Sequence, residues 1–121
     1  MAKPDVPATL KAFDVCYVGY HRSPLYRLGI SPNKVFDYMA AARPIILAAS
    51  AANDPVRDGK CGLTVEPDDP AALAQAIRSL KSVPPAERAR IGSNGRTYVE
   101  RVHSYAGLAA LYIPLLDPAA Q

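Results

Sequence analysis

Short runs rich in apolar residues alternate along the chain with longer segments whose apolar residues recur every three or four positions. The runs at 13–19, 45–48 and 62–66 are typical of strands in a parallel sheet that is covered on both faces. Helical spacing predicts helices over 6–12, 31–42 and 70–82, two more over 86–92 and 96–102 with a break at 93–95, and a last one from Ser104. This order predicts a three-layer, Rossmann-like α/β domain with a small parallel sheet.

Two of the predicted helices begin with the same kind of signal. Ser31 and Asp69 are good N-cap residues, and each precedes a proline at the first helical position, where a missing N–H is no loss. In the second helix, residues at helical spacing are expected to face the sheet: Leu73, Ala76, Ile77 and Leu80. In the first helix the expected inward face consists of Val35, Phe36, Met39 and Ala40.

The start of the first of these helices also carries the candidate chemistry. Free backbone N–H groups at a helix start attract anions, and Lys34 adds a positive charge beside them. Asn33 and Asp37 stand four positions apart and therefore share one face. An anion site with a carboxylate one turn away suits a nucleoside diphosphate. The alternative interpretation makes Asp37 an exposed residue paired with Lys34, with Ser31 as a structural cap.

Three segments, 31–43, 44–48 and 58–65, together resemble a known family. They are similar to the C-terminal, donor-binding domain of retaining GT-B glycosyltransferases of family 4, group 1, and most similar to bacterial surface-polysaccharide members with a Ser-Pro-Asn-Lys helix start. The resemblance runs from about residue 6 to about residue 115. It implies that Asp37 holds the ribose hydroxyls of the donor, while the partner acid of the family's pair falls on Gly29.

The resemblance implies a function as well. The expected reaction transfers a sugar from a nucleotide-diphosphate sugar to a hydroxyl acceptor with retention, in cell-surface polysaccharide biosynthesis. The expected substrate-binding residues are Ser31, Asn33, Lys34 and Asp37, and no catalytic residue is assigned. No metal or other cofactor is expected.

The length of 121 residues fits one domain, 1–121, and is too short for the two-domain GT-B architecture. We therefore expect an incomplete nucleotide-sugar-binding domain, inactive alone, whose N-terminal acceptor domain or partner chain is missing. With three predicted strands, one sheet edge should be exposed and favour self-association. The alternatives are a non-catalytic nucleotide-sugar-binding module, a structural fragment that needs a partner chain, and an unrelated Rossmann-like fragment.

Charge narrows the class of partner. The net charge is +3, and residues 1–60 hold eight Lys/Arg against five Asp/Glu, whereas the remainder has six of each. This local excess favours a phosphate-sized anion, because a nucleic-acid surface needs a longer basic stripe. His21 and Arg22 belong to the excess but are interpreted as solvated, and His103 as a surface or packing residue.

The remaining sequence features address the compartment and other chemistries. Cys16 and Cys61 lack zinc-site spacing and are expected to be buried thiols. No apolar run approaches the ~20 residues of a membrane span, and there is no signal-peptide pattern, so we expect a cytoplasmic protein. Peripheral membrane association through the full enzyme stays open. The apolar residues of 108–116 predict either an interface or packing on the domain's own sheet.

Overall fold

A parallel sheet with helices on both faces forms the described part of the chain. The computed structural model describes residues 9–10, 12–29 and 33–102. The strands are β1 (Cys16–Gly19), β2 (Ile45–Ala48) and β3 (Gly62–Val65), in the order β1-β2-β3 and all parallel. The helical segments are η2 (Pro24–Leu28), α2 (Asn33–Ala40), α3 (Pro55–Gly59), α4 (Pro70–Ser82) and α5 (Pro85–Val102). The predicted α/β fold with a small parallel sheet is confirmed.

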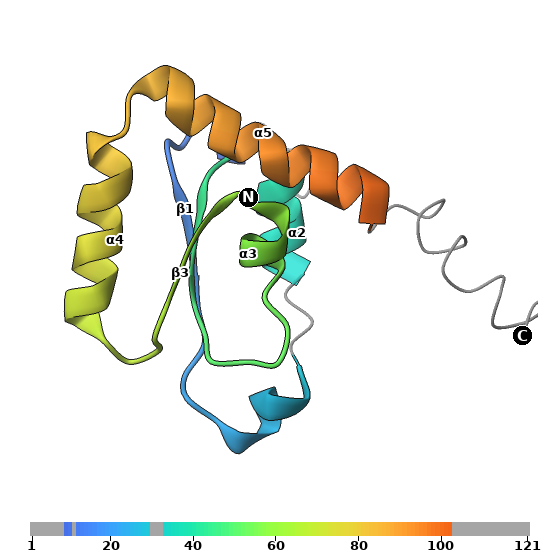
Figure 1. The fold of residues 1–121 in the computed structure, drawn as a ribbon, viewed down its shortest axis with the longest axis vertical. Coiled ribbons are helices and arrows are strands. Elements are labelled where there is room, and N and C mark those ends of the chain that lie inside the picture. Colours follow the sequence, from blue (N-terminus) through green and yellow to red (C-terminus); the bar gives the residue numbers. More distant parts are fainter. Residues whose placement is uncertain (1–8, 11, 30–32, 103–121) are drawn as a thin grey trace, which may run out of the picture.

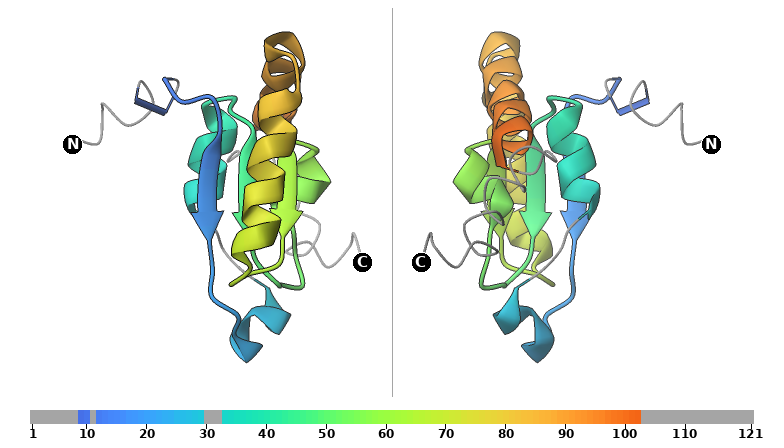
Figure 2. Two further views of the ribbon diagram at one scale, coloured as in Figure 1. Left: turned by 90° about the vertical axis from the view of Figure 1, so that its left-hand side faces the viewer. Right: turned by 90° about the vertical axis from the view of Figure 1, so that its right-hand side faces the viewer.

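The helices form the outer layers of a three-layer arrangement (Figure 1). α2 and α3 cover one face of the sheet and α4 covers the other, while α5 crosses the amino ends of the strands and packs on α2 and α3. In Figure 2, α4 lies in front of the sheet in the left view, and α2 lies in front of it in the right view, which is taken from the opposite side. This is the layering that parallel strands joined by helices require.

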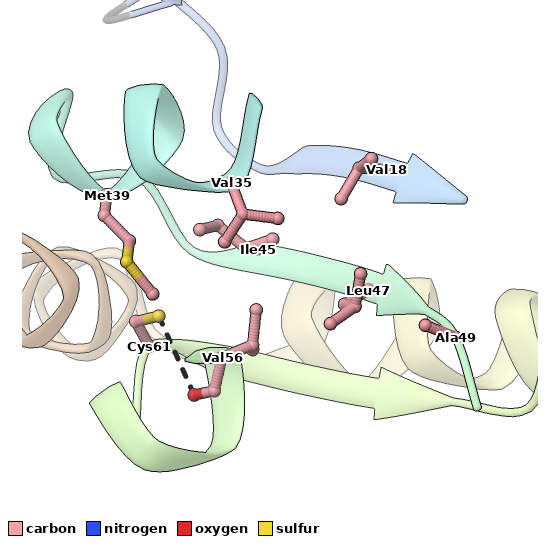
Figure 3. Packing of buried hydrophobic residues seen from close by; sticks show 8 residues of the cluster. All are labelled: Val18, Val35, Met39, Ile45, Leu47, Ala49, Val56 and Cys61. Carbon is pink, nitrogen blue, oxygen red and sulfur yellow. Dashed lines mark hydrogen bonds between the residues drawn. The ribbon is translucent and has the colours of Figure 1, made fainter. Parts of the chain in front are cut away.

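The alternation of side chains along the strands divides the core into two clusters. On the face covered by α2 and α3, the cluster (Figure 3) consists of Val18, Val35, Met39, Ile45, Leu47, Ala49, Val56 and Cys61. On the opposite face Ile46 packs against Ala76 and Leu80 of α4. All four residues of β2 are buried, as expected for a central strand with helices on both sides.

Both cysteines are free and buried, as predicted. The Cys61 thiol donates to the Val56 carbonyl oxygen at 3.7 Å (Figure 3). Burial raises the pKa of Cys61 to about 11, and burial likewise raises the pKa of Cys16. Both groups are therefore neutral thiols at physiological pH.

The predicted break in the last described helix is wrong, because α5 is continuous from Pro85 to Val102. Its glycines are buried at helix contacts. A Cβ on Gly92 would lie 2.2 Å from the Ala42 carbonyl oxygen, and one on Gly95 would lie 2.9 Å from the Cβ of Cys61. Gly92 and Gly95 therefore permit close packing of α5, and the packing outweighs their low helix propensity.

Two expectations about inward faces also need correction. Val35 and Met39 of α2 are fully buried and Phe36 is half-buried, but Ala40 is exposed. On α4, Ala76 and Leu80 are buried while Ile77 is 51% exposed. α4 packs mainly on β2 and β3, so the side of the helix toward β1 has no sheet beneath it to cover Ile77.

Other element boundaries differ only slightly from those predicted. β1 is shorter than the predicted 13–19, and the loop that follows contains η2. α4 begins with Asp69 as N-cap and Pro70 at its first position, as predicted. Several predictions lie outside the described residues: most of the helix at 6–12, the Ser31-Pro32 helix start, His103, and the helix from Ser104 with its apolar residues at 108–116.

Candidate functional site

The loops that follow the three strands emerge at the same edge of the sheet, because the strands are parallel. The residues concerned are 20–23 after β1, 49–54 after β2 and 66–69 after β3. η2 leads from the first of these loops toward α2, so α2 also begins near this edge (Figure 1). Open α/β sheets bind their ligands at the carboxyl ends of the strands, so a ligand-binding site is expected at this edge.

Lys34 and Asp37 both lie on α2 with exposed side chains. Neither forms an ion pair with a described residue, so the alternative Lys34–Asp37 pair is not formed. Asn33 is the first residue of α2, while Ser31 and the proline that follows it lie outside the described residues. The buried faces of Val35 and Met39 anchor the helix on the sheet and leave Lys34 and Asp37 accessible to a ligand.

The larger hollow at this edge lies on the side of α4. It has a volume of about 490 Å³ and is open to solvent. Its lining comes from β1, the loops after β1 and β3, and the start of α4: Tyr17, Gly19, Tyr20, His21, Ala48, Glu66, Asp68, Asp69, Pro70 and Leu73. Lys34 and Asp37 are not part of this lining. Asp37, the predicted carboxylate, therefore lies apart from this hollow.

Two residues that sequence reasoning left out of the site connect loops at this edge. His21 Nδ1 lies 2.8 Å from Asp68 Oδ1, and the Arg22 backbone N–H donates to Asp68 Oδ2 at 3.1 Å. The Arg22 guanidinium donates to Glu66 at 3.0 Å. The Arg22 amide first, and then the hydrogen bond from His21, holds the pKa of Asp68 below its usual value. These contacts join the loop after β1 to the loop after β3.

A sequence signal for this link does exist in the turn 67–70. Asp68 has a positive φ of 59°, a left-handed conformation that Asp and Asn adopt more readily than most residues. Pro67 and Pro70 flank the pair Asp68-Asp69, so one carboxylate caps α4 and the other is left to face the neighbouring loop. His21, which contacts Asp68 from the loop after β1, lies 47 positions before it in the sequence. Local sequence patterns cannot identify a partner at that separation.

A second, smaller hollow of about 200 Å³ lies between the ends of β2 and β3. Asp54 lines it and is 7% exposed; its carboxylate accepts from the Arg57 backbone N–H at 2.9 Å and caps α3. The lining is mostly polar: Leu47, Ala49, Ser50, Ala51, Asn53, Asp54, Arg57, Thr64 and Glu66. Lys34 and Asp37 do not line this hollow either.

Two further features of the described residues concern metal binding and membrane crossing. Within 9–10, 12–29 and 33–102, no group of three or more His, Cys, Asp or Glu side chains is arranged to hold a metal ion. In the same ranges, none of the helices has the length and apolar character needed to cross a bilayer.

Comparison with known proteins identifies the family of the chain. The model of the family described as glycosyl transferases group 1 matches residues 1–82, which is more than half of the sequence. The match covers β1 to α4 and therefore includes Lys34, Asp37 and both hollows. No curated protein and no solved structure matches significantly. The chain belongs to the glycosyl transferases of group 1.

Proposed function

We propose that the chain is the donor-binding part of a retaining GT-B glycosyltransferase of family 4 that acts in cell-surface polysaccharide biosynthesis. The observation that carries the proposal is the position of an accessible carboxylate, Asp37, on the helix that begins near the carboxyl ends of the strands in a chain of this family. Membership of the family implies a nucleotide-sugar donor.

Each predicted residue has a role in this proposal. The Asp37 carboxylate accepts hydrogen bonds from the ribose hydroxyls of the donor. The helix start at Ser31 and Asn33 offers backbone N–H groups to the diphosphate. The Lys34 ammonium adds a point charge that stabilises the diphosphate leaving group as the sugar departs.

The position of these residues also favours a second candidate function. Lys34 and Asp37 line neither of the two hollows described at the carboxyl edge. A non-catalytic module, or a donor-binding part whose pocket is completed by another domain or a partner chain, fits that observation. Under either candidate the lone chain binds a donor weakly and transfers no sugar.

A ligand series tests the proposal. The full chain is titrated calorimetrically with uridine, UDP and GDP, and with UDP-sugars, and the series is repeated with Lys34→Ala and with Lys81→Ala as a matched exposed control. We expect a nucleoside diphosphate to bind more tightly than its nucleoside, and Lys34→Ala to reduce that difference while Lys81→Ala does not. The donor-site proposal fails if no nucleoside diphosphate binds, or if Lys34→Ala and Lys81→Ala change the binding of the diphosphate equally.

A further inference from the structure

The segment between β1 and α2 extends past the carboxyl ends of the strands. It comprises residues 20–29, includes η2, and is drawn in light blue in Figure 1. We call residues 20–29 the strap. Its first residue is fixed to β2, because the Tyr20 amide donates to the Ala48 carbonyl at 2.8 Å. Beyond the strap, residues 30–32 lead to Asn33, the first residue of α2.

The first half of the strap is bound to the loop after β3 through one carboxylate. Asp68 Oδ2 accepts the Arg22 backbone N–H at 3.1 Å, and Asp68 Oδ1 lies 2.8 Å from His21 Nδ1. The Arg22 guanidinium also donates to Glu66 at 3.0 Å. The side chain of His21 is almost fully exposed and that of Asp68 is half-exposed, so the ion pair alone contributes little. The attachment therefore depends on both contacts that Asp68 makes.

The second half of the strap is bound to the loop after β2. The Tyr26 carbonyl oxygen accepts two backbone N–H groups, one from Gly29 at 3.0 Å and one from Ala52 of that loop at 3.1 Å. Gly29 has a φ of 114°, and a Cβ at this position would lie 3.1 Å from Asn53 Oδ1. Glycine adopts this backbone conformation without strain and allows the close approach. The end of the strap is therefore fixed four positions before Asn33, where α2 begins.

The two halves of the strap are joined by an aromatic contact. The rings of Tyr20 and Tyr26 meet edge to face, with centroids 5.4 Å apart and an interplanar angle of 76°. Ser23 closes the turn between them, since its hydroxyl oxygen accepts the Leu25 amide and its carbonyl oxygen accepts the Tyr26 amide. A displacement of the first half of the strap is therefore transmitted to Tyr26.

The strap restricts the position of the first turn of α2. Val35 is fully buried and anchors the helix from its third residue onward. Asn33 and Lys34 precede that anchor, so their backbone position depends also on the chain that leads into them. The Cα atoms of Gly29 and Asn33 can lie no more than about 14 Å apart, the reach of the four extended residue steps between them. The fixed position of Gly29 therefore limits where the helix can start.

We propose that Asp68 and Arg22 are positioning residues for the diphosphate of the donor: they hold the strap, and the strap holds the first turn of α2. This inference rests on the proposed donor function. It divides the proposed site into two parts. Lys34 and the helix start depend on the strap, whereas Asp37 follows the buried Val35 and does not. Release of the strap should therefore weaken the binding of the diphosphate and leave the binding of the nucleoside unchanged.

Two neighbouring aspartates supply the test and its control. Asp68→Gly removes the carboxylate that holds the strap, and glycine adopts the positive φ of 59° at this position without strain. Asp69→Ala removes the N-cap of α4, which lowers stability without removing a contact of the strap. The full chain is titrated with UDP or GDP, whichever binds, and with the corresponding nucleoside, and chemical shifts are followed by NMR.

We expect Asp68→Gly to bind the diphosphate about three- to tenfold more weakly than the wild type. Its affinity for the nucleoside should be unchanged, and Asp69→Ala should bind both ligands as the wild type does. Asp68→Asn keeps an oxygen that can accept the Arg22 amide, so it should restore most of the affinity for the diphosphate.

A wild type that binds no nucleoside diphosphate overturns the donor function and, with it, this role of the strap. The donor function stands and the positioning role is wrong if the wild type binds the diphosphate and Asp68→Gly binds it equally well. The same conclusion follows if Asp68→Gly weakens nucleoside binding to the same extent, or if Asp69→Ala weakens diphosphate binding as much as Asp68→Gly does.

Amide hydrogen exchange of the free protein tests the strap without a ligand. The Ala52 amide donates to Tyr26 at the far end of the strap, and Asp68→Gly does not alter either residue. If the strap moves as a unit, the Ala52 amide should exchange faster in Asp68→Gly than in the wild type, and at the wild-type rate in Asp69→Ala. An Ala52 exchange rate that is the same in Asp68→Gly and the wild type contradicts the proposed transmission along the strap.

Discussion

The backbone of Gly92 lies against the carbonyl oxygen of Ala42, with no space for a side chain between them. Ala42 follows α2 with a positive φ of 57°, so its carbonyl is held by a left-handed turn and has little freedom to move. Gly92→Ala should lower the free energy of unfolding by about 1–3 kcal/mol through overpacking. Urea denaturation measures this loss. Ser93→Ala, exposed on the same helix, is the control and should be close to neutral; equal effects of the two substitutions would argue against the close contact.

The buried cap of α3 predicts a second stability effect. Asp54 is 7% exposed and accepts the Arg57 amide hydrogen, so Asp54→Ala removes the cap and leaves that donor in a partly buried place. We expect a loss of about 1–2 kcal/mol in the free energy of unfolding. Asp58→Ala changes an exposed carboxylate of the same helix and should cost much less. A larger loss in Asp58→Ala would show that the cap is not the important contact.

Thiol labelling tests the packing of the core. Cys61 is fully buried, its pKa is raised to about 11, and Cys16 is buried with a raised pKa as well. Because the thiolate is the reactive form, iodoacetamide at pH 8 should leave both cysteines of the native protein unmodified. Ser79→Cys, exposed on α4, supplies a reactive control, and denaturation in urea should expose all cysteines. Labelling of Cys61 in the native protein at the rate of the control would contradict the packing around α3.

The link between His21 and Asp68 predicts a small pH effect. The pKa of Asp68 is lowered in the folded protein from its usual 3.8, mainly by the Arg22 amide and then by His21. A depressed carboxyl pKa contributes stability above the unfolded value, and that contribution is lost as pH falls through the folded value. The melting temperature should therefore be higher for the wild type than for Asp68→Asn at neutral pH. This difference in melting temperature should shrink below about pH 4. A difference that stays constant down to pH 2.5 would show that the carboxylate charge is not involved.

Local patterns predicted the parts of the fold in which local and tertiary preferences agree. Asp69 and Pro70 start α4 as expected because an N-cap followed by proline acts within one turn. The helix break predicted at 93–95 was wrong because that prediction rested on the low helix propensity of glycine. The close packing of Gly92 on Ala42, which is far away in sequence, outweighs this propensity. The prediction that Ile77 faces the sheet was wrong for a related reason. Helical spacing identifies the apolar side of a helix but not which strands lie under it.

Only the part of the candidate site that lies on α2 could be predicted from the sequence. Lys34 and Asp37 follow from the helical pattern and are accessible as expected. The two hollows are built from loops after three different strands, and the His21–Asp68 contact joins positions 47 residues apart. Such groupings depend on strand order and loop geometry, which periodicity does not encode.

The central claim, that Asp37 holds the ribose hydroxyls of a nucleotide donor, is tested most directly by a cycle of two ligands and two proteins. The wild type and Asp37→Ala are each titrated with UDP or GDP, whichever binds, and with its 2′,3′-dideoxy analogue, with Asp58→Ala as the control protein. Charge-assisted hydrogen bonds of about 1.5–3 kcal/mol predict that Asp37→Ala weakens binding of the natural diphosphate by tens-fold to about a hundredfold. The same substitution should leave the affinity for the dideoxy analogue almost unchanged. An equal loss for both ligands, or no loss for either, would contradict the claim.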